Sequence, residues 1–211
     1  MDLVITLVTT KLAKRLRIGL LLLVALLLAA SCAKRVTRTD ADEQIDLSGR
    51  WNDTDSRLVA EEMIKDSMSS PWLKRFEREN AGRVPVVIVY SVKNRSSEHI
   101  NTQTFVKNLE RAFVNSGVVD VVASQDQRAE IRGERANQQS GFVENPALIG
   151  KELGADFVLT GVLNTINDRL QGNEVVFYQV NLELISVQTN RKAWIGEKQI
   201  KKLVDRAKTT F

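Results

Sequence analysis

VPVVIVYSV, residues 84–92, sets the fold class of this 211-residue chain. β-branched side chains follow one another here without the polar alternation of a strand that has one face in water. We therefore expect a strand that other elements cover on both faces of its sheet. Gly82 stands just before this run and is expected to end a preceding helix.

A helix and a second strand are expected after this first strand. Residues 93–101 form a polar loop, after which side chains suited to a core recur at i, i+4, i+7 and i+8: Phe105, Leu109, Ala112 and Phe113. This spacing predicts an amphipathic helix, capped near Asn101 or Thr102 and ended by a left-handed Gly117. Residues 118–123 predict a second buried strand, and the succession of strand, helix and strand predicts a mixed α/β domain.

Two helices are expected before the strand. Residues 45–56 combine turn signals with apolar residues, and we expect an irregular segment that Trp51 pins to the domain. The next helix, about residues 55–68, has apolar side chains at helical spacing, namely Leu58, Val59, Met63 and Ile64, and can be capped by Asp53, Thr54 or Asp55. Ser70 as cap and Pro71 at the first position predict a second helix, with an apolar face of Trp72, Leu73 and Phe76.

The segment from residue 125 to residue 141 carries few apolar side chains and is expected to be a solvated helix. Its arginines also suit a surface that contacts a partner protein, and the sequence leaves both interpretations open. Asn145 and Pro146 predict the start of a short helix that ends at Gly154.

The remainder of the chain predicts further strands. Residues 157–166 predict a third strand, and Gly172-Asn173 predicts a hairpin turn. From Val176 onward apolar and polar residues alternate, which indicates a strand with one buried and one wet face. Residues 192–200 predict an edge strand, and residues 201–211 predict a helical tail. The expected fold is therefore α/β (α+β), a mixed sheet of about four to five strands flanked by helices.

The amino-terminal stretch predicts export and lipid attachment. LLLLVALLLAASCA, residues 20–33, follows four basic residues. Its apolar core of about 13 residues is shorter than the roughly 20 that a membrane-spanning helix needs, so it is typical of a secretory signal peptide. Residues 28–32, Leu-Ala-Ala-Ser-Cys, resemble a bacterial lipobox, with Ala29 where such motifs usually carry Leu. We expect lipid on Cys32.

This leader divides the chain into three parts. We expect a lipoprotein signal peptide at residues 1–31, a lipidated cysteine and flexible tether at residues 32–45, and a periplasmic domain at residues 46–205. An ordinary signal peptide with an incidental cysteine, and an anchor that is not cleaved, are the alternatives.

Composition and missing motifs argue against several functions. The chain has 30 basic and 26 acidic residues, of which residues 1–31 hold four and one, so 26 and 25 remain and nothing favours nucleic-acid binding. Lipid on the single cysteine leaves no thiol for a disulfide or a thiolate metal site, and His99 is the only histidine. Phosphate-binding glycine loops and catalytic side-chain sets are missing. We therefore expect no enzymatic activity, no cofactor, no metal and no small-molecule substrate.

Two surfaces are candidates for contact with a partner protein. The first is the loop that follows the buried strand, because loops at strand ends commonly carry function. Its candidate residues are Asn94, Arg95, Glu98 and His99. The second is the solvated helix of residues 125–138, with Arg128, Arg132 and Arg135 as charged contacts.

Four stretches carry a family resemblance: residues 46–56, DLSGRWNDTDS; 85–89, PVVIV; 94–100, NRSSEHI; and 154–161, GADFVLTG. Together they resemble the penicillin-binding-protein activator lipoproteins of the LpoB type, and the first and third are the specific ones. The resemblance covers about residues 45–200 and implies a fold like the amino-terminal domain of TolB. It also implies an outer-membrane lipoprotein, facing the periplasm, that binds and stimulates a class A penicillin-binding protein, a bifunctional peptidoglycan synthase.

The tether departs from the pattern of this family. Members that reach an inner-membrane synthase through the cell wall carry long linkers, whereas residues 34–44 reach at most about 40 Å when fully extended. Ala33 after the cysteine is compatible with sorting to the outer membrane. The alternative function is that of a structural lipoprotein in an outer-membrane assembly or secretion complex.

Overall fold

The computed structural model describes residues 37–40, 43–148, 150–170 and 173–205. The chain divides into two compact units, residues 1–43 and 44–211, and the second holds the elements described below. The predicted signal peptide and Cys32 lie outside the described residues. In the part of the chain that is described, no helix is both long and apolar enough to cross a membrane.

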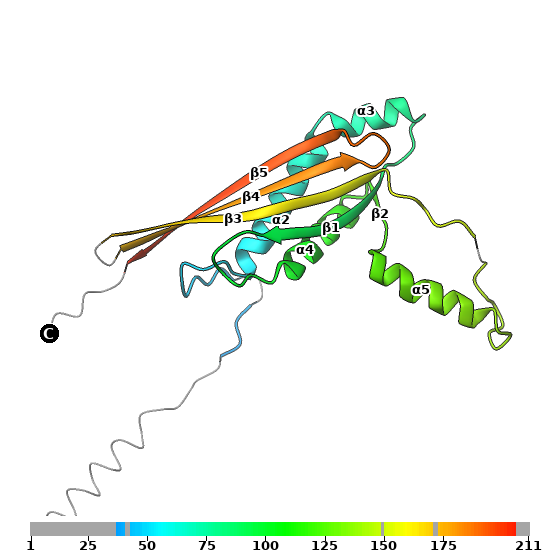
Figure 1. The fold of residues 1–211 in the computed structure, drawn as a ribbon, viewed down its shortest axis with the longest axis horizontal. Coiled ribbons are helices and arrows are strands. Elements are labelled where there is room, and N and C mark those ends of the chain that lie inside the picture. Colours follow the sequence, from blue (N-terminus) through cyan, green and yellow to red (C-terminus); the bar gives the residue numbers. More distant parts are fainter. Residues whose placement is uncertain (1–36, 41–42, 149, 171–172, 206–211) are drawn as a thin grey trace, which may run out of the picture. The chain divides into compact units, whose positions relative to one another are not determined.

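In its described residues, the second unit consists of a five-stranded mixed sheet and four helices (Figure 1). The helices are α2 (Asp53–Ser69), α3 (Trp72–Glu79), α4 (Thr102–Ser116) and α5 (Gln125–Gln138), and the strands are β1 (Val86–Asn94), β2 (Asp120–Val121), β3 (Phe157–Leu170), β4 (Asn173–Ser186) and β5 (Lys192–Asp205). The strand order is β2-β1-β3-β4-β5. β1 runs parallel to β2 and β3, whereas β3, β4 and β5 are antiparallel neighbours. The predicted fold class, a mixed sheet flanked by helices, is confirmed.

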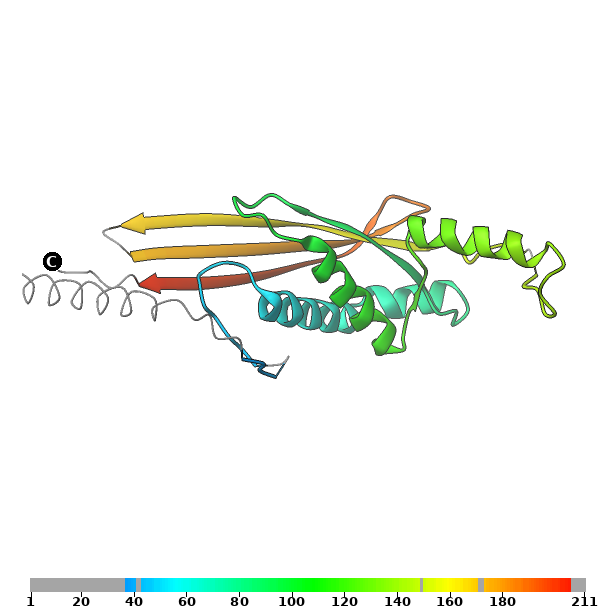
Figure 2. The ribbon, with the colours of Figure 1, turned by 90° about the horizontal axis from the view of Figure 1, so that it is seen from below.

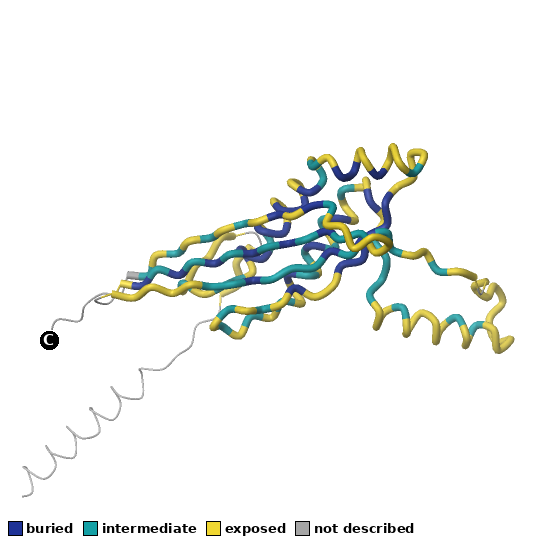
Figure 3. The backbone as a smooth tube through the Cα atoms, turned by 45° about the horizontal axis from the view of Figure 1, so that its top comes forward, coloured by how far each residue is buried: buried dark blue, intermediate teal, exposed yellow. Residues whose placement is uncertain are grey.

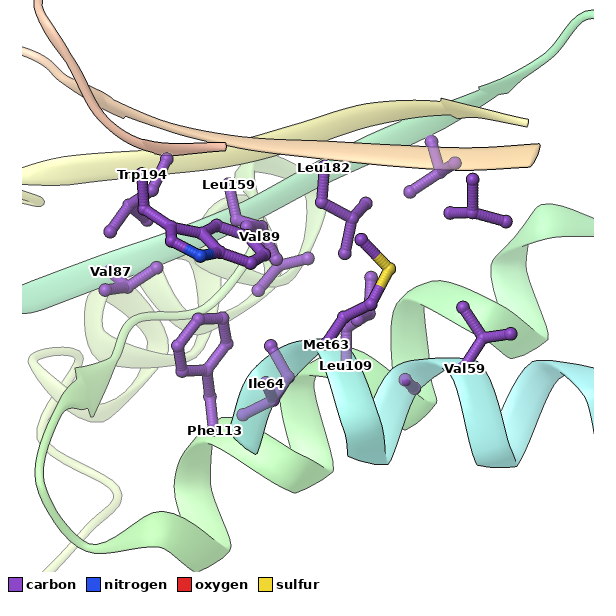
Figure 4. Close-up of a cluster of buried hydrophobic side chains, with 14 of the residues drawn as sticks. Val59, Met63, Ile64, Val87, Val89, Leu109, Phe113, Leu159, Leu182 and Trp194 are labelled. Atoms are coloured by element: carbon purple, nitrogen blue, oxygen red, sulfur yellow. The ribbon is translucent and has the colours of Figure 1, made fainter. Parts of the chain in front are cut away.

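Helices cover one face of this sheet. Figure 2 shows α2 and α4 against that face, while α5 stands apart from the sheet. The core lies between the sheet and these helices, where buried side chains such as Met63, Leu109, Phe113 and Leu182 interlock (Figure 4). β3, β4 and β5 continue past the helices, and their far ends are more exposed (Figure 3).

The cap of α2 lies one residue before the earliest predicted candidate, and the helix begins at Asp53, two residues earlier than predicted. Asn52, and none of the predicted residues, caps the helix: its side chain accepts a hydrogen bond from the Asp55 N–H, while the Asp55 carboxylate accepts one from the Asn52 N–H. Reciprocal capping satisfies two backbone donors at once, which favours Asn52 over its neighbours. Leu58, expected in the core, is 44% exposed, because the buried face of α2 runs through Val59, Ala60, Met63 and Ile64.

The predicted cap of α3 is wrong. The Ser70 hydroxyl donates to the carbonyl of Asp66, within α2, and Pro71 has helical dihedral angles but makes no side-chain cap. The connection between the two helices is short, so Ser70 lies within reach of the last turn of α2 and its hydroxyl bonds a carbonyl there instead of capping α3. The predicted apolar face is confirmed: Trp72 and Phe76 are buried and pack edge-to-face on Phe157.

Two strand predictions hold only in part. In β1, Val86 to Val89 are buried, but Tyr90 and Ser91 are exposed where the pairing with β3 shifts in register. β2 is only two residues long and pairs with β1 alone, so the strand predicted at residues 118–123 is much shorter. Val119 alone of these residues is fully buried. By contrast, α4 begins after Asn101 and ends at Gly117 with a left-handed backbone (φ 67°), as predicted.

The predicted helix at residues 145–154 is absent from the described residues of this segment. The backbone of this segment forms hydrogen bonds instead with two glutamine side chains, one at the end of α5 and one at its C-cap. Gln138 accepts from the Ala147 N–H, and Gln139 donates to the Ala147 carbonyl. These bonds satisfy backbone groups that a helical turn would otherwise pair.

The carboxyl-terminal strands are longer than predicted. β3 and β4 pair residue for residue from Phe157 with Ser186 to Leu170 with Asn173, and the turn between them at residues 171–172 lies outside the described residues. The alternating burial predicted for β4 is confirmed. β5 continues to Asp205, so the helical tail predicted from residue 201 is wrong over the described residues. Pairing with β4 decides this, because every residue from 201 to 205 has a partner there.

Candidate functional site

The candidate loop at the end of β1 is held in one conformation by its own side chains. The Asn94 amide donates to the Glu98 carbonyl (2.8 Å), and its oxygen accepts from the backbone and hydroxyl of Ser96 (2.9 and 2.6 Å). The Arg95 N–H donates to the Leu163 carbonyl of β3 (2.8 Å). The loop is therefore closed on itself and attached to the sheet.

The side chain of Glu98 anchors this loop to the domain. Its carboxylate accepts a hydrogen bond from the Trp51 N–H (3.2 Å) and another from the hydroxyl of Tyr178 (2.5 Å). The carbonyl oxygen of Gly49 lies 2.9 Å from the same hydroxyl. Burial, reinforced by the hydrogen bond to Glu98, raises the pKa of Tyr178 above its usual value. Glu98 thus joins three segments that are far apart in the sequence.

Residues 45–51, the segment before α2, are fixed beside this loop. The Lys202 ammonium contacts the carboxylates of Asp55 (2.6 Å) and Asp46 (2.9 Å) and the carbonyl of Arg50 (3.1 Å). The hydrogen bond from Lys202 lowers the pKa of Asp46. Trp51 is half-buried and packs edge-to-face on Tyr178. The prediction that Trp51 pins this segment to the domain is therefore confirmed.

These contacts divide the four predicted loop residues into two groups. Asn94 and Glu98 are half-buried and use their polar atoms inside the protein. Arg95 and His99 are exposed. A cleft of about 250 Å³ opens beside the loop, with Arg50 and Arg169 among its lining residues. Ser97 and Glu98 are the loop residues that line this cleft, whereas Arg95 and His99 are not among its lining residues.

The second candidate surface is an arm formed by α5 and the returning segment of residues 139–156. None of the residues of α5 is buried. Arg132 forms two hydrogen bonds with the Glu152 carboxylate (2.8 and 2.7 Å), and Arg135 lies 3.3 Å from it. The hydrogen bond from Arg132 is the main cause of the lowered pKa of Glu152. Arg128 is half-buried, and its Nε has no hydrogen-bond partner among the described residues.

Sequence patterns do not reveal the roles of Tyr178, which holds the loop, and Lys202, which holds the segment before α2. The alternation of residues predicts only that Tyr178 is buried, and the pattern of residues 201–211 predicts only a tail that contains Lys202. No local signal marks either as a partner of Glu98 or Asp55, since the partners lie 80 and 147 positions away. Within the described residues, no group of histidine, cysteine or acidic side chains could hold a metal ion.

A comparison with family models identifies the family. The model described as peptidoglycan-synthase activator LpoB matches residues 55–200, from the first turn of α2 into β5. This chain belongs to the LpoB family. The match confirms the resemblance seen in the sequence. It includes all five strands and all four helices described above, except the first two residues of α2 and the last five of β5. Members of the LpoB family are activators of peptidoglycan synthases by that description.

A comparison with solved structures also finds members of this family. The LpoB carboxyl-terminal domain from Salmonella enterica is 18% identical, with a TM-score of 0.33 over 64% of this chain and 94% of that one. The corresponding domain from Escherichia coli is 17% identical, with a TM-score of 0.36 over 63% and 100%. Lipoprotein GNA1162 from Neisseria meningitidis is 14% identical, with a TM-score of 0.39 over 59% and 88%. No curated protein sequence matches the chain significantly.

Proposed function

We propose that this protein is a lipid-anchored regulator that binds and activates a class A penicillin-binding protein, a bifunctional peptidoglycan synthase. The observation that carries the proposal is the LpoB family match over residues 55–200. In this proposal the protein acts by contact and carries out no chemistry of its own. Its loop at residues 94–99 is held by internal hydrogen bonds, so a partner can bind it without a large rearrangement.

The proposal places the protein at the outer membrane, facing the periplasm. Lipid on Cys32 is the anchor, and the residues from 33 to 45 are the tether. Two or more acyl chains bury enough methylene groups to make release from a membrane slow. Mass spectrometry of the mature amino terminus tests this part: an acylated Cys32 is expected, and an unmodified thiol on an uncleaved chain would contradict it.

We propose the loop at residues 94–99 as the surface that contacts the synthase. Arg95 and His99 are exposed while the loop backbone is already fixed by Asn94 and Glu98, so binding costs little conformational entropy. Arg132 of the arm is different, because its guanidinium already forms two hydrogen bonds with Glu152. A partner that used Arg132 would have to compete with this ion pair.

An activation assay tests both the function and the surface. Adding the purified protein to a class A penicillin-binding protein is expected to increase glycan polymerisation and cross-linking. The Arg95→Glu variant is expected to weaken binding about tenfold, the effect of losing one well-placed contact. Arg111→Glu is the matched control, because Arg111 is an exposed arginine of α4 on another part of the surface.

The outcomes separate the surface from the function. Full activation by Arg95→Glu together with loss of activation by Arg132→Glu would move the contact to the arm. No binding by the unmodified protein to any class A synthase would refute the function itself. Cross-linking to an outer-membrane channel would then favour the alternative of an assembly or secretion complex.

A further inference from the structure

β5 forms an open edge of the sheet. It pairs with β4 along its length, and no strand in the described part of the chain pairs with its other side (Figure 1). A 14-residue edge presents a long row of unpaired backbone N–H and C=O groups. Such an edge can add a strand from another chain.

The side chains on the outer face of β5 form a self-complementary series. The side chains alternate in exposure along the strand, and the exposed ones on the face away from the helices are Ile195, Glu197, Gln199, Lys201 and Leu203. Read in either direction, the order of types is apolar, charged, amide, charged, apolar, with the two charges of opposite sign. A second copy in antiparallel orientation presents this series reversed.

We propose that two copies of this chain pair through their β5 strands, antiparallel and centred on Gln199. In this register Glu197 lies opposite Lys201 of the second copy, and Ile195 lies opposite its Leu203. The two-fold axis repeats each of these pairs, so the interface gains two opposite-charge pairs and two apolar pairs. Cross-strand pairs of both kinds stabilise antiparallel sheets. The two sheets then form one continuous ten-stranded sheet.

The series selects this register over its neighbours. Slipping the second strand by two residues in one direction places Ile195 opposite Lys201 and Glu197 opposite Gln199. A slip by two in the other direction places Glu197 opposite Leu203. Both slips bring a charge against an apolar or neutral side chain and lose the ion pairs. A slip by one residue places the outer-face side chains of one copy beside the inner-face side chains of the other, since side chains alternate between faces. The helices of the two copies would then lie on opposite faces of the paired sheet.

The inner face of β5 does not oppose this pairing. Lysines on an edge strand commonly prevent association, but both lysines on this face are neutralised within the chain. Lys198 contacts Glu62 of α2 (2.5 Å), and Lys202 contacts Asp55 (2.6 Å). Lys201, on the outer face, has no ion-pair or hydrogen-bond partner among the described residues. The Glu197 carboxylate accepts hydrogen bonds from the neutral amides of Gln179 (2.6 Å) and Gln199 (2.5 Å), which leave its charge available to the second copy.

A cleft lies beside the β5 edge on the helix side of the sheet. This cleft of about 560 Å³ lies between α2 and β5, and Leu58 and Ile200 are among its lining residues. A two-fold axis perpendicular to the sheet places the helices of both copies on one face, so the two clefts lie on the same side of the paired sheet. Leu58, which is 44% exposed in the single chain, lies on that side.

A charge-swap experiment tests the register. The full chain in excess neutral detergent is expected to sediment as a concentration-dependent dimer. Glu197→Lys and Lys201→Glu each replace two attractive pairs by two repulsive ones and are expected to weaken the dimer about tenfold or more. The double variant Glu197→Lys/Lys201→Glu restores both pairs and should recover the original dissociation constant. A chain that stays monomeric, or single variants that dimerise normally, would overturn the proposal.

Disulfide trapping tests the centre of the interface. Gln199→Cys places a thiol opposite its own copy, at a separation that a disulfide can bridge, so a covalent dimer is expected on oxidation. Gln179→Cys is the matched control, because Gln179 pairs with Gln199 one strand further from the edge and would be too far from its copy. Cys32 is present in both variants, so the original chain gives the background. Equal trapping in both variants would overturn the proposed centre.

Discussion

Replacing Tyr178 by Phe removes one buried hydroxyl and little else. Tyr178 is fully buried, and the Phe ring keeps the edge-to-face contact with Trp51, whose ring centre lies 5.5 Å away. What is lost is the hydrogen bond to Glu98, at 2.5 Å. A hydrogen bond to a charged group contributes about 1.5–3 kcal/mol, so we expect a loss of about 2 kcal/mol. For a domain of this size that corresponds to a fall in Tm of about 4–8 °C.

The same residue predicts an alkaline effect. The folded protein raises the pKa of Tyr178, whereas the unfolded chain releases this proton near pH 10. Its stabilising effect is therefore complete below about pH 10 and is lost as the pH rises toward the folded pKa. At pH 11 the original protein should have lost about 1.4 kcal/mol through this group, and Tyr178→Phe should not. The difference between the two proteins should shrink accordingly.

Thermal unfolding followed by circular dichroism, at neutral pH and at pH 11, measures both effects. Tyr90→Phe is the control, because Tyr90 is 51% exposed and its loss of a hydroxyl should change stability by less than about 0.5 kcal/mol. Equal stability of the Tyr178→Phe and Tyr90→Phe variants at neutral pH would refute the proposed role of the Glu98 hydrogen bond. A stability difference that does not change between the two pH values would refute the alkaline argument.

Three further predictions, the first with a control substitution, test the packing of the sheet and an ion pair beside it. Gly161→Ala places a methyl group 2.4 Å from the backbone of β4 and should destabilise the protein by about 1–3 kcal/mol. Gly133→Ala, the control, has open space around it and should leave stability unchanged or raise it by up to about 1 kcal/mol. Denaturant titration measures both changes. Phe113→Ala should cost about 3–5 kcal/mol in the same titration, because this core ring is fully buried. Lys202→Met leaves the buried carboxylate of Asp55 without its cation and should cost about 1–3 kcal/mol, and an unchanged midpoint would contradict that role.

Predictions from local patterns succeeded where a single element contains its own signal. The boundaries of α4 followed from Asn101, Gly117 and the helical spacing between them, and the burial of β4 followed from its alternation. Such predictions failed where adjacent residues could each serve as the cap of the same helix. Asn52 caps α2 in place of Asp53 because only Asn52 forms the reciprocal pair with Asp55. A propensity scale cannot resolve such a competition between adjacent residues.

The candidate loop likewise has features that the sequence reveals and features that only the structure reveals. Its position after a buried strand, its polar character and its family resemblance were all visible in residues 94–100. Which of its side chains face solvent was not visible, because Glu98 is turned inward by Tyr178 and Trp51, 80 and 47 positions away. Periodicity reports which side of an element is buried. Only the order and register of the strands decide which distant groups meet there, and that order is a property of the whole sheet.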